Sequence, residues 1–347
     1  MGCNISVWDV DTATSCNARN APILVTGVAG FIGMHLTQAL LARGEQVVGV
    51  DNLNDYYDPV LKEARLAQLQ TYSAFTFERM DITHQQMFSA LLARLHPTRI
   101  VHLAAQVGVR YSITQPHAFI DANLSGFLNV LEAARHLQRA GMFTHLVYAS
   151  SSSVYGANSK VPFAVEDRVD TPVSLYAVSK RANELMAQVY ARQFGIAATG
   201  LRIFTGYGPW GRPDMAAFKF TRAILAGEPI DVYNHGQLQR DFTYIDDIIS
   251  GVLAVLDRPP PAVEGVPHAL YNIGNHQPEP LLHFIEVLAQ ALGRIPRLNL
   301  LPMQPGDVLM TYADTASLQH DFGWRSTTTI EQGLPRFVVW YREHYGV

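Results

Sequence analysis

The stretch PILVTGVAGFIGMHLTQALLARGEQVVGVDN, residues 22–52, decides the fold. A short apolar run at 22–27 ends in glycine, and apolar side chains then recur with a helical period over 31–43. Gly44 stands where a C-cap glycine belongs, and a second apolar run ends at Asp51. These residues predict a strand, a helix and a second, parallel strand within about thirty residues.

The same alternation continues along the chain. Residues 99–105, 145–151 and 196–204 predict strands, while 116–139 and 175–194 predict helices. Strands that are apolar along their whole length are typical of a parallel sheet covered on both faces. We therefore predict an α/β fold with a Rossmann-like, doubly wound parallel sheet.

Composition limits the classes of function. The net charge is −4 over 347 residues, so no basic field favours a nucleic acid or an anionic membrane. No apolar stretch is long enough to span a bilayer. Two cysteines, Cys3 and Cys16, provide neither a zinc spacing nor a disulfide framework and fit a reducing, cytoplasmic compartment. Thirteen scattered histidines predict no metal site, and the polar residues 1–20 predict a flexible extension rather than a signal peptide.

The glycines of GVAGFIG, residues 27–33, lie where the first strand turns into the first helix. Glycine allows a tight turn and a close approach to a pyrophosphate, which the helix N-terminus attracts. Asp51 closes the second strand, where an acid hydrogen-bonds a ribose 2′-hydroxyl and repels a 2′-phosphate. The pattern thus favours NAD over NADP as the cofactor.

A second pattern concerns proton transfer. Tyr176 and Lys180 are four residues apart on a predicted helix and share one face. The lysine charge and a positive nicotinamide can lower the tyrosine pKa enough to make it a base. Four serines, 150–153, end a predicted strand at the edge where α/β sheets bind ligands. Together these residues predict a Ser–Tyr–Lys constellation.

These motifs resemble the extended, sugar-nucleotide-modifying branch of the short-chain dehydrogenase/reductase superfamily over residues 22–345. Its glycine spacing is GxxGxxG, and Val154-Tyr155-Gly156 after the serines also fits. The resemblance implies that Ser151 is the catalytic hydroxyl, Tyr176 the base and Lys180 its partner. It further implies these cofactor contacts: Gly27, Gly30, Phe31, Ile32, Gly33, Asp51, Asn52, Asp81, Ile82, Leu103, Ala104, Ala105, Tyr176 and Lys180.

Longer strings are similar to those of UDP-glucuronate 4-epimerases, above all DNLNDYYD (51–58) and GPWGRPDM (208–215). This resemblance implies an isomerase that converts UDP-glucuronate to UDP-galacturonate through a transient 4-keto sugar, for polysaccharide biosynthesis. It also implies a homodimer whose interface uses helices 116–139 and 175–194.

The resemblance also implies a substrate site. Thr205 and Arg212 would hold the sugar carboxylate beside Ser152 and Ser153, because a 4-keto hexuronic acid otherwise loses CO2 readily. Tyr233 would pack on uracil. The full implied set is Arg110, Ser151, Ser152, Ser153, Thr205, Arg212, Lys219, Phe220, Val232, Tyr233, Arg240 and Asp307, of which Arg240 and Asp307 would contact the UDP phosphates and ribose.

The predicted domains follow from these sites. Stretches rich in Gly and Pro at 208–214 and 259–267 predict loops, and helices are expected at 214–227, 281–293 and 329–344. We predict an NAD-binding domain over 21–205, to which 238–276 returns, and a smaller substrate-binding lobe made of 206–237 and 277–347.

Two residues depart from the family strings. Gly206 stands where the family has valine in Arg-Phe-Phe-Thr-Val-Tyr-Gly, and Val107 stands where alanine is usual. Gly206 adds backbone freedom next to Thr205 and bears on how the carboxylate is held. The alternatives that the sequence leaves open are a UDP-glucuronate decarboxylase, a UDP-glucose/galactose 4-epimerase, a 4,6-dehydratase and a non-catalytic NAD-binding regulator.

Overall fold

The computed structural model describes residues 21–303 and 308–347. The predicted extension 1–20 and Asp307 therefore lie outside the described residues. The chain divides into two compact units. Of the described residues, the first holds 21–150 with Ser174–Gly200 and Val255–Leu270. The second holds Ser151–Val173, Leu201–Ala254, 271–303 and 308–347.

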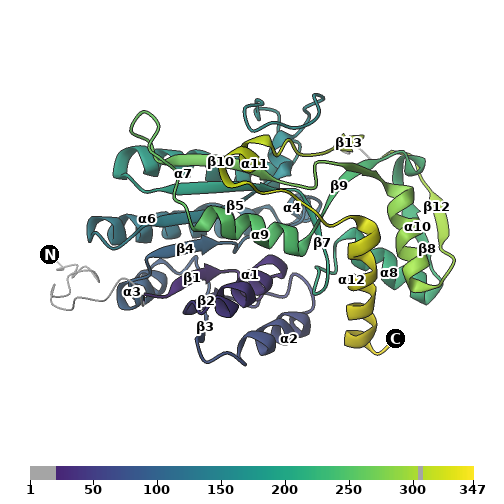
Figure 1. Cartoon of the computed structure of the whole chain (residues 1–347), viewed down its shortest axis with the longest axis horizontal. Coiled ribbons are helices and arrows are strands. Elements are labelled where there is room, and N and C mark those ends of the chain that lie inside the picture. The colour runs from purple at the N-terminus through teal and green to yellow at the C-terminus, as the bar shows by residue number, and fades with distance from the viewer. Residues whose placement is uncertain (1–20, 304–307) are drawn as a thin grey trace. The chain divides into compact units, whose positions relative to one another are not determined.

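A seven-stranded sheet with the order β10-β6-β5-β4-β1-β2-β3 confirms the predicted fold class (Figure 1). From β3 to β6 this is the doubly wound order 3-2-1-4-5-6. Parallel registers join β1 to β2 and β4, β2 to β3, and β4 to β5. The strands are β1 (Ile23–Thr26), β2 (Val47–Asp51), β3 (Phe75–Arg79), β4 (Arg99–His102), β5 (His145–Ser151), β6 (Ala198–Ile203) and β10 (His268–Ile273).

Helices of the first unit pack in two groups. Helices α1 and α2 contact each other, and α6 contacts both α3 and α7 (Figure 1). Phe88 of α3 and Val130 of α6 are fully buried in one apolar cluster with the strand residues Leu24 and Ile100. The helices are α1 (Phe31–Ala42), α2 (Pro59–Leu69), α3 (Gln85–Leu95), α4 (Tyr111–Thr114), α5 (Pro116–Phe119), η1 (Ile120–Ser125), α6 (Gly126–Arg139) and α7 (Leu175–Phe194).

The helix expected over 116–139 is interrupted by the π-helical turn η1. Asn123 is buried within this turn, and its backbone oxygen accepts a 2.6 Å hydrogen bond from the side-chain amide of Asn183 in α7. A π-turn changes the usual i→i−4 pairing of backbone groups. The Asn183 bond therefore satisfies a carbonyl in the turn from another helix.

The second unit is built around β9 (Gln239–Tyr244). It pairs in parallel with β7 (Thr205–Tyr207) and β13 (Met310–Thr311), and antiparallel with β11 (Pro278–Pro280). Helix α10 (Leu281–Leu292) packs on α8 (Ala216–Ala226) and on α12 (Ile330–Tyr345). The other elements that this unit contributes to are η2 (Ser152–Tyr155), β8 (Pro229–Val232), η3 (Tyr233–Gly236), α9 (Ile245–Leu256), β12 (Arg297–Leu300) and α11 (Ala316–Phe322).

Asp241 on β9 joins three segments of the second unit. Its fully buried carboxylate accepts hydrogen bonds from the backbone N–H groups of Asn275, His276 and Ala313, and from the hydroxyl of Thr243. Burial raises the pKa of Asp241, and the hydrogen bonds oppose that rise. The carboxylate thus accepts the hydrogen bonds of backbone donors that are buried and that water cannot reach.

We expect Asp241→Ala to lower the free energy of unfolding by about 3 kcal/mol, because it leaves buried N–H groups without an acceptor. Urea unfolding followed by fluorescence measures the change. Asp231→Ala is the matched control, since Asp231 is exposed on β8 and bonds to Asn299 of β12, and we expect a change within about 0.5 kcal/mol. Equal stability of the two variants would contradict the assignment.

Candidate active site

The glycine turn after β1 leaves no room for a side chain at Gly27 or Gly33. Gly27 has φ +74°, and a Cβ there would lie 2.6 Å from the backbone nitrogen of Ala104. A Cβ on Gly33 would lie 2.1 Å from the carbonyl oxygen of Gly27. Gly30 caps the N-terminus of α1 without a side-chain hydrogen bond. This cradle fits a dinucleotide, because the first backbone N–H groups of a helix have no intrahelical acceptor and can bind a pyrophosphate.

Asp51 lies beside this turn at the end of β2. Its carboxylate accepts hydrogen bonds from the backbone N–H groups of Ala29, at 3.1 Å, and Leu53, at 2.9 Å. Burial raises the pKa of Asp51, while the Leu53 N–H and the charge of Lys62 oppose the rise. The acid predicted to bind the ribose is therefore fixed against the predicted pyrophosphate turn.

A second acid is held next to Asp51. Asn52 donates a 2.8 Å hydrogen bond to Asp81, and Thr83 donates to the same carboxylate from its backbone N–H and its hydroxyl. Burial alone would raise the pKa of Asp81, but these hydrogen bonds outweigh it and lower the pKa. The adjacent Ile82 is buried. Asn52 and Asp81 thus meet although 29 residues separate them in sequence.

The remaining predicted cofactor residues divide by exposure. Phe31 is buried in the first turn of α1, and Ile32 is half-buried. The segment Leu103–Ala105 follows β4 and is half-buried; the N–H of Leu103 donates to the Thr26 carbonyl, and that of Ala104 to the Thr26 hydroxyl. The structure therefore places this segment directly against the glycine turn.

Tyr176 and Lys180 lie one turn apart at the start of α7, whose N-cap Ser174 accepts a hydrogen bond from the Ala177 N–H. Lys180 is buried, and its Nζ donates a 2.8 Å hydrogen bond to the carbonyl of Ala149. Burial lowers the pKa of Lys180 to about 8. The lysine is thus still mostly protonated at pH 7. Tyr176 is half-buried and contacts Phe119 edge to face.

His102 is a buried neighbour of this pair that sequence reasoning missed. Its Nδ1 shares a 2.8 Å hydrogen bond with the hydroxyl of Thr26, and its ring stacks on Phe127. Burial, followed by the charge of Lys180, lowers the pKa of His102 to about 3. The imidazole is therefore neutral at every physiological pH. In the sequence, the available signal was a histidine inside the apolar strand predicted at 99–105.

The serine cluster divides between two tasks. Ser150 donates a 2.6 Å hydrogen bond to the buried Glu184 of α7, which also pairs with Arg181. Ser151 caps η2, and its hydroxyl oxygen accepts the N–H of Ser153. Ser152 and Ser153 are half-buried in η2. The Glu184 contact gives Ser150 a structural role and leaves 151–153 as the substrate candidates.

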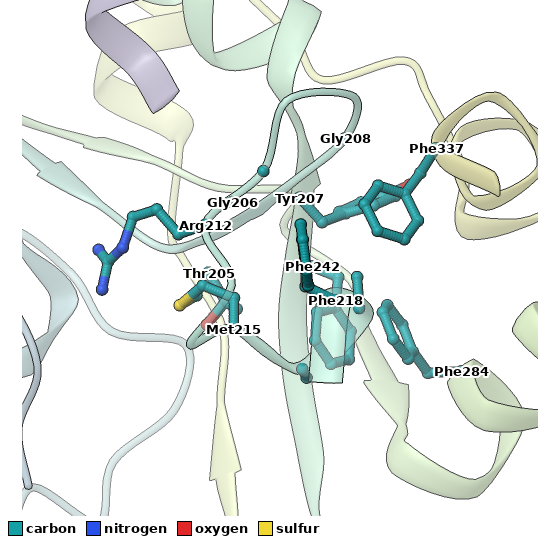
Figure 2. A pocket seen from close by; sticks show the side chains of 13 residues that line it. Thr205, Gly206, Tyr207, Gly208, Arg212, Met215, Phe218, Phe242, Phe284 and Phe337 are labelled. Atoms are coloured by element: carbon teal, nitrogen blue, oxygen red, sulfur yellow. The ribbon is translucent and has the colours of Figure 1, made fainter. Parts of the chain in front are cut away.

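The second unit contains a pocket with a polar and an apolar side (Figure 2). Thr205 and Arg212 lie on one side, and four phenylalanines from β9 and three helices line the other. Arg212 pairs with Asp214 through Nε at 3.0 Å and Nη2 at 2.5 Å. Gly206 lines the same pocket beside Thr205. Because glycine has no side chain, the pocket is wider next to the proposed carboxylate site.

Other predicted substrate residues do not line this pocket. Val232 is fully buried at the end of β8, and Tyr233 is half-buried where η3 begins. Arg240 of β9 donates to the carbonyls of Gln239 and Leu309. Two further residues lie on α8, Lys219 exposed and Phe220 half-buried, and Arg110 is exposed at the start of α4. The structure therefore brings together only part of the predicted set within one pocket.

Among residues 21–303 and 308–347, no group of three or more His, Cys, Asp or Glu side chains could hold a metal ion. No helix in these ranges is long and apolar enough to cross a membrane.

Known proteins match this arrangement. The model of the NAD-dependent epimerase/dehydratase family matches residues 23–274. UDP-glucuronate 4-epimerase 1 of Arabidopsis thaliana is 42% identical over 98% of this chain and 81% of its own length, and a probable UDP-glucuronate 4-epimerase of Rhizobium meliloti is 43% identical over 93% and 97%. The crystal structure of UDP-glucuronic acid 4-epimerase from Bacillus cereus, in complex with UDP-glucuronic acid and NAD, has a TM-score of 0.85 at 33% identity over 93% of this chain and 100% of that one. The chain therefore belongs to the NAD-dependent epimerase/dehydratase family, in the group that includes the UDP-glucuronate 4-epimerases.

Proposed function

We propose that this protein catalyses the NAD-dependent 4-epimerisation of UDP-glucuronate to UDP-galacturonate. The observation that carries the proposal is the buried Lys180 one helical turn from Tyr176, in a unit that also contains the glycine turn and Asp51. The similarity to UDP-glucuronate 4-epimerases over almost the whole chain supports the choice of substrate. NAD, when bound, would accept a hydride from C4 of the sugar and later return it.

In this proposal Tyr176 takes the proton of the C4 hydroxyl and later gives it back. Lys180 stays mostly charged at pH 7, and a positive charge one helical turn away favours the basic phenolate of Tyr176. Ser151 donates a hydrogen bond to the oxygen at C4 as it becomes a ketone. The 4-keto sugar rotates in the site between its oxidation and its reduction, so that the hydride would return to the opposite face of C4.

The carboxylate of the sugar needs separate control. The 4-keto intermediate is a β-keto acid, which loses CO2 when the carboxylate bond stands perpendicular to the ketone plane. Thr205, Ser152 and Ser153 would hold the carboxylate by hydrogen bonds, and Arg212 by a charge-assisted pair. Asp214 already holds the Arg212 guanidinium through two atoms, which limits its rotation in the pocket.

Proton NMR of purified protein with UDP-glucuronate and no added NAD tests the function. We expect UDP-galacturonate to form until an equilibrium mixture is reached, because bound NAD is regenerated in each turnover. Formation of a UDP-pentose or its 4-keto form would replace the proposal by a decarboxylase. If neither product forms, even with added NAD, while UDP-glucose is converted, the enzyme is a UDP-glucose/galactose 4-epimerase.

The remaining assignments follow from this function. We propose that residues 21–205, with 238–276, bind NAD and that 206–237 and 277–347 bind the sugar nucleotide. Arg110, Lys219, Phe220, Val232 and Tyr233 would contact the UDP-sugar, as would Arg240 and Asp307. A cytoplasmic location and a role in polysaccharide biosynthesis fit a sugar-nucleotide product and a chain with only two cysteines.

We also propose a homodimer through α6 and α7. Val178, Leu185 and Val189 are 43–48% exposed and lie on one face of α7, at positions i, i+7 and i+11. On the neighbouring α6, Leu128 is 41% exposed. An exposed apolar stripe across two packed helices favours burial against a second copy.

Leu185→Asp is expected to convert the dimer to a monomer, because it puts a charge in the centre of this stripe. Sedimentation velocity of the intact protein measures the change. Val339→Asp, at an apolar residue that is 56% exposed on α12, is the matched control and should leave the mass unchanged. A wild-type monomer, or a dimer that survives the Leu185 change, would rule out this interface.

A further inference from the structure

Two loops leave the seven-stranded sheet on either side of the glycine turn. Strand β1 lies between β2 and β4 and is parallel to both (Figure 1). The loops 52–58 and 103–110, which follow β2 and β4, therefore start at the same edge of the sheet as the turn after β1. This carboxyl edge is where dinucleotides bind in such sheets. A contact between the two loops thus bridges the end of β1, where the NAD site lies.

Tyr56, in the loop after β2, makes this contact. Its ring centre lies 4.8 Å from that of Tyr111, the first residue of α4. A Cβ built on Gly108 would lie 2.3 Å from the Tyr56 hydroxyl, so the backbone after β4 approaches this oxygen as only glycine allows. Gly108 also has φ +103°, which side chains disfavour. Tyr56, Gly108 and Tyr111 are called the strap below.

The first end of the strap is fixed to the glycine turn itself. Arg65 of α2 is fully buried, and its Nη1 donates hydrogen bonds to the carbonyl of Ala29, at 3.0 Å, and to the hydroxyl of Tyr57, at 2.6 Å. Ala29 belongs to the glycine turn, and Tyr57 contacts Tyr56 edge to face. Movement of the loop 52–58 away from the turn would therefore break hydrogen bonds of a buried guanidinium.

The other end of the strap leads to the proposed base. The Tyr111 ring contacts Phe119, which is fully buried, and Phe119 contacts Tyr176; the ring centres are 6.2 and 6.1 Å apart. The backbone N–H of Ser112 donates to the carbonyl of Gly108 and fixes the start of α4. Aromatic contacts thus run without a break from the loop 52–58 to Tyr176.

The proposed reaction has a requirement that such a strap can meet. Each turnover passes through a ketone, and the hydride taken from C4 has to return to the same sugar. Early loss of the reduced cofactor would leave the ketone without its reductant and the enzyme without NAD. Two aromatic rings in contact across the site oppose its opening, because separating them exposes apolar surface and breaks the pair.

We propose that the strap retains the dinucleotide, and that opening of the contact between Tyr56 and Tyr111 sets the rate at which NAD leaves. The two tyrosines hold the loops together across the end of β1 and take no part in proton or hydride transfer. The inference rests on NAD as the cofactor and on the proposed place of its pyrophosphate, and it holds for any sugar substrate.

The release of NAD from the purified, folded protein tests the proposal. The protein is loaded with radiolabelled NAD, mixed with a large excess of unlabelled NAD and desalted at set times. We expect Tyr56→Ala and Tyr111→Ala each to speed the loss of label by about tenfold, the effect of one lost aromatic contact. Tyr72→Ala is the matched control, since Tyr72 is also half-buried but lies beyond the other end of α2, and it should release label at the wild-type rate.

Two further variants separate the contact from a general loosening of the loops. Tyr56→Ala combined with Tyr111→Ala should release NAD about as fast as either single variant, because each single change already breaks the contact. Tyr56→Phe keeps the ring and should stay within about threefold of the wild-type rate, the effect of one hydrogen bond.

Three results would overturn the inference. Wild-type release from Tyr56→Ala or Tyr111→Ala would show that the strap does not control the departure of NAD. Equal acceleration by Tyr72→Ala would assign the effect to lost stability. An increase of about a hundredfold in the double variant would mean that the two tyrosines act independently and not through their contact.

This readout needs no sugar nucleotide. If NAD release depends on the strap as described but UDP-glucuronate is not converted, the proposed reaction is wrong and the inference stands. If the protein is an active epimerase and both single variants release NAD at the wild-type rate, the reverse holds. In an active epimerase the two variants should also lose turnover on dilution and regain it when NAD is added, because the strap takes no part in the chemistry.

Discussion

Tyr176→Phe is expected to lower the turnover of UDP-glucuronate by about a thousandfold, the usual contribution of a positioned general base. The change removes one oxygen from a half-buried side chain and keeps the ring contact with Phe119. Turnover is measured by NMR, and the NAD released by acid from the same sample should equal that of wild type. A non-catalytic regulator would have no turnover to lose.

Tyr190→Phe is the control for this prediction. Tyr190 lies on the same helix, and its hydroxyl bonds to Glu132 of α6. We expect its removal to change turnover by no more than about threefold, the range of an ordinary hydrogen bond lost away from the chemistry. If both variants lose activity equally, the helix rather than the Tyr176 hydroxyl is responsible.

Gly33→Ala is expected to destabilise the protein by about 3 kcal/mol and to empty the NAD site. The new methyl group would lie 2.1 Å from the carbonyl oxygen of Gly27 and 2.9 Å from Cα of Val28, so the backbone of the turn must move. Thermal unfolding and acid-released NAD measure the two effects. The melting temperature and the amount of bound NAD should fall together, since the same turn packs α1 against β1 and would receive the pyrophosphate.

Gly30→Ala provides a graded comparison. Its Cβ would lie 3.0 Å from the same oxygen, and its φ of −75° is open to any residue. We expect a loss of about 1 kcal/mol and partial retention of NAD. Wild-type stability and full NAD content in Gly33→Ala would show that the turn is not the tight cradle described above.

The parts of the fold that sequence predicts are those with local signals. The turn between β1 and α1 and the ends of α1, α7 and α10 follow from glycines, caps and apolar period, and the predicted sheet is confirmed. Strand β3 gave no such signal. It lies at the edge of the sheet, and none of its residues is fully buried, so its FTFER string lacks a continuous apolar run.

What sequence could not predict depends on contacts between distant segments. The π-turn in 116–139 goes with Asn183, sixty residues away, which donates to Asn123. The neutral state of His102 depends on burial and on Lys180. Lys62 and Arg65 look like ordinary surface charges of an amphipathic helix until the fold buries them. Chemical type is visible in a sequence, but environment is not.

The aromatic contacts of α12 have a consequence for synthesis of the protein. Phe337 of this helix lines the pocket that contains Arg212, and Trp340 and His344 contact Trp210 in the loop that carries that arginine. Residues 330–345 are synthesised after all the strands of the seven-stranded sheet. The strands of the first unit can therefore pair before this wall of the pocket exists. Nascent chains stalled before Ile330 would therefore lack part of the wall of the pocket.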